Sequence, residues 1–195
     1  MRRDTTPTVK FTYEDFVNFP DDGKRHELID GDHYVTPSPN TKHQRIAWNL
    51  TVEVGSYLKH HPTGEAFAAP FDVVFSDLDV VEPDLFYISH ERSGVVTDTH
   101  VRGAPDLVVE ILSPGTRKTD EVRKRKLYER SGVREYWILD PELDTIKIYR
   151  QVAGAFARAA ELSVENGDTL TTPLLPDWSV ALAQVFAEPV PTRLP

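Results

Sequence analysis

The sequence predicts an α/β fold of the α+β type, in which a mixed β-sheet is flanked by helices. Three consecutive segments carry this prediction: an apolar stretch at 106–112, a basic helix-forming stretch at 119–131 and a second apolar stretch at 135–140. The first is apolar on both faces, which is typical of a strand at the centre of a sheet. Strand, helix and strand in this order form a parallel crossover unit. The antiparallel pair expected at 145–150 and 155–160 makes the sheet mixed.

The first part of the chain should contain a short helix and a hairpin. The helix is expected from Thr12 to Pro20, where the proline stops it, with its phenylalanines facing inward. Residues 25–35 form two extended stretches around Asp30-Gly31, and Asp-Gly is typical of a tight hairpin turn.

A long helix should follow the hairpin. After a loop at 36–40, either Asn40 or Thr41 is expected to cap the helix, which should run to about His60. Its apolar residues recur at every fourth position and therefore share one face. They are Ile46, Leu50, Val54 and Leu58.

The remaining elements are expected from apolar runs and turn residues. Strands are predicted at 66–75 and 80–88, followed by an irregular loop at 89–104. Gly132 should end the helix of the crossover unit, because glycine favours the left-handed conformation of a C-cap. A last helix is expected near 179–187.

The chain, 1–195, is expected to be one domain, with a core over about 11–187 and loose ends. No apolar run approaches the roughly 20 residues that a membrane helix needs. Arg2 and Arg3 are followed by no apolar stretch, so the start does not resemble a secretory signal. The absence of cysteine excludes disulfides and thiolate zinc sites. We therefore expect a cytoplasmic protein that makes no contact with a membrane.

Charge is unevenly distributed along the chain. The net charge of −9 is unusual for a protein that binds nucleic acid. Between Arg117 and Arg130, however, seven Lys and Arg residues face three acids, a local excess of four positive charges. A bound divalent cation would also offset clustered carboxylates.

Glu110 and Asp84 are the candidate metal-binding acids. Glu110 lies in an apolar strand, where an ionised carboxylate is costly unless it is paired or bound to a metal. The alternative is that it reaches the end of the sheet or pairs with an arginine. Asp84 lies on the apolar face of its strand, or else is a strand-start residue in a turn. A second Pro-Asp-Leu unit contains Asp106, but Asp106 lies about 13 Å from Glu110 along one strand, too far to share an ion.

Lys124 is the candidate basic residue. It lies on the same helix face as Leu127 and Tyr128, which is the apolar and therefore inward face. Lys126 lies on the opposite face, with the solvated basic residues. The alternative is that Lys124 passes Tyr128 and reaches solvent.

Pro83-Asp84, Glu110 on a strand and Lys124 on the next helix resemble the PD-(D/E)XK nuclease superfamily. More narrowly, the chain is similar to the restriction endonuclease family called Uma-two, over about residues 11–185. The superfamily lysine stands two residues after the glutamate, where this chain has Leu112, whereas in the narrower family it lies on the following helix. The matching stretches are His26–Gly31, Ser38–Gln44, Val81–Leu85, Pro105–Pro114 and Lys124–Trp137.

The resemblance implies a restriction-endonuclease-like fold and a metal-dependent endonuclease. Asp84 and Glu110 would bind Mg²⁺, with Mn²⁺ as a substitute, together with a backbone carbonyl near Ile111. Lys124 would orient the attacking water or stabilise charge on the phosphate. The implied substrate is DNA, or else RNA, and the implied assembly is a homodimer.

The resemblance also implies roles for Glu27 and His43. Glu27 would complete the metal shell, and the alternative is a surface acid of the hairpin paired with Arg25 or Lys24. His43 would contact phosphate or a metal-bound water, and the alternative is a capping or exposed residue at the start of the long helix.

A second hypothesis is a binding or regulatory module that keeps the nuclease fold, acts as a homo-oligomer and cuts nothing. Hydrolases of other classes find little support, because the sequence contains no Gly-x-Ser-x-Gly, no His-Glu-x-x-His and no phosphate loop.

Overall fold

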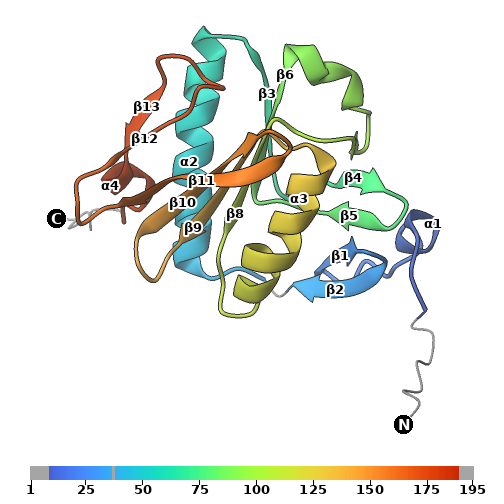
Figure 1. Ribbon diagram of the computed structural model, residues 1–195. Coiled ribbons are helices and arrows are strands. Elements are labelled where there is room, and N and C mark those ends of the chain that lie inside the picture. The colour runs from blue at the N-terminus through green and yellow to red at the C-terminus, as the bar shows by residue number, and fades with distance from the viewer. Residues whose placement is uncertain (1–8, 37, 189–195) are drawn as a thin grey trace, which may run out of the picture.

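A six-stranded mixed sheet forms the centre of the molecule, with helix α2 (Thr41–His60) on one face and α3 (Arg125–Ser131) on the other (Figure 1). The computed structural model describes residues 9–36 and 38–188. The strand order is β11-β10-β9-β8-β6-β3, and the bounds in this order are Ala155–Ser163, Thr145–Val152, Glu135–Asp140, Leu107–Ile111, Leu85–Ser89 and Gly64–Ala68.

A five-stranded sheet packs against the α3 side of this layer. Its order is β2-β1-β5-β4-β7, with the bounds Asp32–Thr36, Arg25–Ile29, Asp79–Val81, Val73–Ser76 and Val101–Arg102. The remaining elements are α1 (Tyr13–Phe16), the 3₁₀ helix η1 (His90–Val95), the π-helix η2 (Thr119–Lys124), the strand pair β12 (Thr169–Thr171) and β13 (Ser179–Ala181), and α4 (Leu182–Val185).

Two apolar cores lie on the two faces of the six-stranded sheet. Ile46, Leu50 and Val54 of α2 pack on one face, with Val109 of β8 among their neighbours. The core on the other face joins α3 to the five-stranded sheet, because it contains Leu127 and Tyr128 together with Ile29 and Val81. Alternate residues of β8 therefore face different cores, and Glu110 points to the α3 side.

The expected crossover unit and hairpin are confirmed. Strand β8 is buried along its length between β6 and β9, and it runs parallel to β9. Strands β1 and β2 pair around Asp30 and Gly31, whose φ angles of 52° and 71° are those of a tight hairpin turn. Asn40 caps α2, and Gly132, with φ of 82°, ends α3.

The expectation of two uninterrupted strands at 66–75 and 80–88 is wrong. Each breaks near a proline, Pro70 or Pro83, which supplies no N–H to a strand ladder. The outer halves, β3 and β6, pair in the six-stranded sheet, whereas β4 and β5 pair in the five-stranded sheet. The chain therefore passes from one sheet to the other at each break. Asp84 lies in the second break, between β5 and β6.

Four smaller expectations need correction. The helix over 119–131 begins with π-helical turns, and residues 179–181 are a strand, because buried and exposed residues alternate there and pair with β12. The loop 89–104 contains η1 and β7, and α1 ends at Phe16. The expected loose ends fall almost entirely outside the described residues. No helix in the described part of the chain is long and apolar enough to cross a membrane.

Candidate functional site

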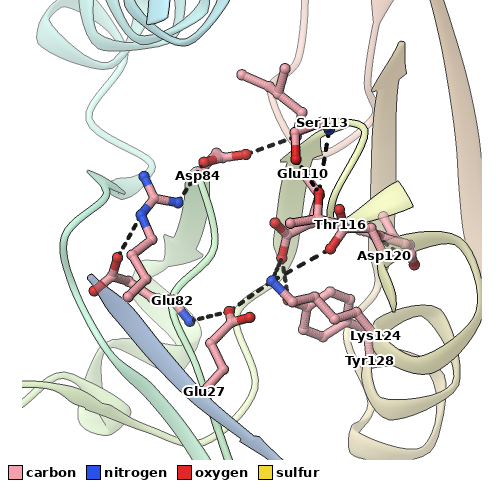
Figure 2. Close-up of polar contacts among 12 residues, drawn as sticks. Glu27, Glu82, Asp84, Glu110, Ser113, Thr116, Asp120, Lys124 and Tyr128 are labelled. Atoms are coloured by element: carbon pink, nitrogen blue, oxygen red, sulfur yellow. Dashed lines mark hydrogen bonds and ion pairs between the residues drawn. The ribbon is translucent and has the colours of Figure 1, made fainter. Parts of the chain in front are cut away.

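A small polar cavity lies where β1, the carboxyl end of β8, η2 and the break between β5 and β6 meet (Figure 2). Its volume is about 20 Å³, which accommodates a water molecule or an ion but not a nucleotide. All five residues predicted from the sequence line this cavity. They are Glu27, His43, Asp84, Glu110 and Lys124.

Lys124 lies at the centre of a group of carboxylates. Its Nζ atom is 2.7 Å from Glu27 Oε1, 3.0 Å from Glu110 Oε1 and 3.6 Å from Asp120 Oδ1. The side chain is 5% exposed, so the alternative of a lysine that reaches solvent is wrong. Although burial lowers the pKa of Lys124, the charges of the three acids raise it well above its ordinary value. The lysine is therefore held as a cation.

Glu110 is buried and accepts two hydrogen bonds on Oε1. Lys124 donates one at 3.0 Å and the Tyr128 hydroxyl donates the other at 2.5 Å. A lysine and a tyrosine, rather than an arginine, therefore satisfy this carboxylate. Burial raises the pKa of Glu110 well above its ordinary value.

Asp84 is buried just before β6 and is held from three sides. Arg25 donates a hydrogen bond to Oδ1 at 2.8 Å, and the backbone N–H of Ile111 donates one to Oδ2 at 2.8 Å. His43 Nε2 lies 3.1 Å from Oδ2. Burial alone would raise the pKa of Asp84, but the hydrogen bond from His43 and the charges of His43 and Arg25 lower it to about 2. Asp84 is therefore both a strand-start residue and an ionised member of the site.

Glu27 points into the cavity from β1 rather than to the surface. Its Oε1 accepts the backbone N–H of Glu82 at 3.0 Å and contacts Lys124. The alternative of a surface acid paired with Arg25 or Lys24 is wrong, because Arg25 contacts Glu82 and Asp84 instead. Glu82, whose backbone N–H binds Glu27, is itself partly buried, and this burial raises the pKa of its carboxyl group to about 7.

His43 is buried at the first turn of α2. The helix is capped by Asn40, whose side chain accepts a hydrogen bond from the His43 backbone N–H, so His43 is neither the cap nor exposed.

Asp106, at the start of β8, contacts Arg92 and Arg134 and lies outside the cavity, as its distance from Glu110 along the strand predicted.

Sequence reasoning missed Asp120 and Arg25, and both carried a signal. Asp120 lies one helical turn before Lys124 and therefore on the same inward face. Arg25 lies two residues before Glu27 and therefore on the same face of β1. Burial raises the pKa of Asp120 to about 6, and its Oδ1 atom accepts no hydrogen bond from the residues described.

The oxygen atoms of the cavity are of the kind that binds a hard divalent cation, but their present positions do not form a coordination site. Four acidic side chains line the cavity together with the cations Arg25 and Lys124, so acids outnumber these cations. Oxygen donors of this kind suit Mg²⁺ and Mn²⁺. Among the described residues, however, no group of three or more His, Asp or Glu side chains is arranged to hold an ion. Lys124 contacts Oε1 of Glu27 and Oε1 of Glu110, which are oxygens that would bind the ion. Ion binding therefore requires the side chains of Lys124, Glu27 and Glu110 to rotate.

Comparisons with known proteins give the family and the fold of this chain. The family model Uma2 (Uma-two), described as "Putative restriction endonuclease", matches residues 13–183. A crystal structure described as "a putative nuclease belonging to DUF820", from Anabaena variabilis ATCC 29413, superposes with a TM-score of 0.76 at 22% identity. The match covers 90% of this chain and 97% of that chain, and at this identity it shows a shared fold. No curated protein matches the sequence.

Proposed function

Because this chain belongs to the Uma2 family, we propose that it is a metal-dependent endonuclease that hydrolyses phosphodiester bonds of DNA. The family description and the restriction-endonuclease-like fold support a nuclease in general. The observation that carries the more specific proposal is the convergence of Glu27, Asp84, Glu110 and Lys124, from distant parts of the sequence, on one buried cavity.

Three acids would hold the metal ion: Asp84, Glu110 and Glu27, with Mg²⁺ or Mn²⁺ as the ion. When bound, such an ion lowers the pKa of a water molecule and stabilises negative charge on phosphate oxygens. The surplus of carboxylates over cations in the cavity supports this assignment. Ionised Asp84, with its pKa of about 2, is ready to bind a cation at neutral pH.

The chain's own side chains would bind and orient the substrate. Lys124 would donate hydrogen bonds to the phosphate or to the attacking water as a cation, because the neighbouring acids raise its pKa. Tyr128 would hold Glu110 in place through its hydroxyl hydrogen bond. Arg25 would position Asp84, and His43 would contact the phosphate at the mouth of the cavity.

A cleavage assay tests the proposal. Purified protein should cut supercoiled or linear DNA with Mg²⁺ or Mn²⁺ and not with EDTA, and Asp84→Asn and Glu110→Gln should abolish cutting. Glu65→Gln is the matched control, because Glu65 is an exposed acid of β3 outside the cavity. Cutting in EDTA, or cutting by both site variants at the wild-type rate, would contradict it.

A binding or regulatory module remains the second candidate function. It is favoured by the ion pairs that Lys124 makes in the cavity, which close the site without a metal. The wild type would then bind DNA or RNA but leave duplex, single-stranded and RNA substrates intact with either ion. A homodimer is proposed for both functions, and sedimentation velocity tests it.

A further inference from the structure

Trp48 is the one tryptophan whose side chain lies at the surface of this protein. It is 69% exposed, whereas Trp137 and Trp178 are 0% and 6% exposed and stack on each other in the core. A large aromatic ring left in water is costly and is typical of a surface that binds something. The inward face of α2 is occupied by Ile46 and Leu50, so the helix presents Trp48 outward.

Trp48 lines a second, larger cavity that adjoins the candidate site. This cavity has a volume of about 260 Å³, and its walls include Trp48, Gln44 and Thr51 of α2 and, at the end of β3, Ala68 and Ala69. It shares three residues with the small catalytic cavity: Arg25, His43 and Asp84. A ligand that places a phosphate at the catalytic cavity therefore reaches this second cavity with its neighbouring group.

We propose that the cavity beside Trp48 is a nucleobase subsite, in which Trp48 stacks on an unpaired base next to the phosphate at the catalytic cavity. This inference rests on the proposed nuclease function. The ring provides a flat surface for stacking, and the amide of Gln44, one helical turn earlier, lies where it can hydrogen-bond to the edge of a base. Stacking of this kind tolerates any base sequence.

The surroundings favour a nucleobase over a second copy of this chain. Beside the Trp48 ring and three alanines, the walls of the cavity carry the charged side chains of Arg25 and Asp84, whereas the centre of a dimer interface is depleted of charged residues. Val52, one turn further along α2, is also exposed, but it does not line the cavity. Val52→Ala is therefore the matched control for a general loss of apolar surface.

Binding of a fluorescently labelled single-stranded oligodeoxynucleotide tests the subsite. Cleavage is prevented in one of two ways. The wild type is measured in EDTA, or the Trp48 variants are made in the inactive Glu110→Gln protein, which is measured in Mg²⁺. The oligonucleotide should quench the emission of Trp48, and an abasic strand of equal length should not. Trp48→Ala should weaken binding roughly 5- to 100-fold, Trp48→Tyr should retain most of it, and Val52→Ala should change it little.

The outcomes separate this inference from the proposed function. If Trp48→Ala binds and cuts as the wild type does, the subsite is wrong and the nuclease stands. If the wild type is quenched by the strand but cuts nothing, the subsite stands and the nuclease proposal fails. If Trp48→Ala instead converts a dimer to a monomer in sedimentation velocity, the ring belongs to a dimer interface and the subsite is overturned. Equal quenching by the abasic strand would also overturn it.

Discussion

Lys124 carries a single positive charge among three buried acids, so its removal should be costly. Lys124→Met leaves Glu27 and Glu110 without their shared partner. We expect the free energy of unfolding to fall by about 3–5 kcal/mol without metal. Lys126→Met, on the exposed face of the same helix, should change it by less than about 0.5 kcal/mol. Urea denaturation measures both, and equal effects would show that Lys124 is not central to the cluster.

The same substitution should change metal binding in the opposite direction. Because Lys124 Nζ contacts oxygens that would bind the ion, the lysine and the ion compete for them. Lys124→Met should therefore show a larger rise in melting temperature with Mg²⁺ than the wild type, and no DNA cleavage. Thermal unfolding with increasing Mg²⁺ checks this, and a smaller rise than in the wild type would exclude competition.

At the residue scale, the strand or helix face that each residue occupies predicted Asp84, Glu110 and Lys124, whereas Glu27 and His43 were expected only from the family resemblance. The helical position of Lys124 beside Tyr128 and the isolated acid at Glu110 were enough to place both side chains in the interior. Partners could not be predicted, because pairing depends on which strands meet in space. The hydrogen bond from Arg25 to Asp84 joins residues 59 positions apart, and no local pattern indicates it.

At the element scale, two glycines should respond to alanine with opposite signs. Gly132 ends α3 with φ of 82°, which alanine adopts at a cost, so Gly132→Ala should destabilise the protein by about 1 kcal/mol. Gly55 lies inside α2 with open space around it, so Gly55→Ala should stabilise by about 0.5–1 kcal/mol. Chemical denaturation measures the two changes, and the same sign for both would contradict these assignments.

Regular elements were predictable and irregular ones were not. The hairpin, α2 and the crossover unit follow from turn residues and apolar periodicity. The breaks near Pro70 and Pro83 were not expected. Both prolines are compatible with a break, but a proline can also stand at the start of a strand, so its presence alone does not predict one. The π-helical turns at 119–124 have no sequence signal of their own, and they occur at the segment that carries Asp120 and Lys124.

For the whole molecule, stability without metal should fall as pH rises from about 5 to 7. Burial raises the pKa of Asp120 from 3.8 to about 6 and that of Glu82 from 4.5 to about 7. Between these values the folded protein holds protons that the unfolded chain has lost, so raising the pH favours unfolding. The lowered pKa of Asp84 matters only below about pH 4.

Thermal unfolding in EDTA at pH 5, 6 and 7 measures this dependence. Glu82→Gln should reduce the decrease, because one of the raised pKa values is removed. Mg²⁺ should raise the melting temperature more at pH 7 than at pH 5, since the ion binds ionised carboxylates. A wild-type melting temperature that rises with pH in EDTA would show that the cluster does not take up protons in the folded state.

The proposed nuclease depends on binding of a divalent ion by Asp84, Glu110 and Glu27. Isothermal titration calorimetry with Mn²⁺ at pH 7.5 tests it most directly, on the wild type, Glu110→Gln and the Glu65→Gln control. We predict saturable binding to the wild type and to Glu65→Gln, and binding at least roughly tenfold weaker for Glu110→Gln. Equal affinity in all three proteins, or no binding to the wild type, would show that these acids do not form a metal site.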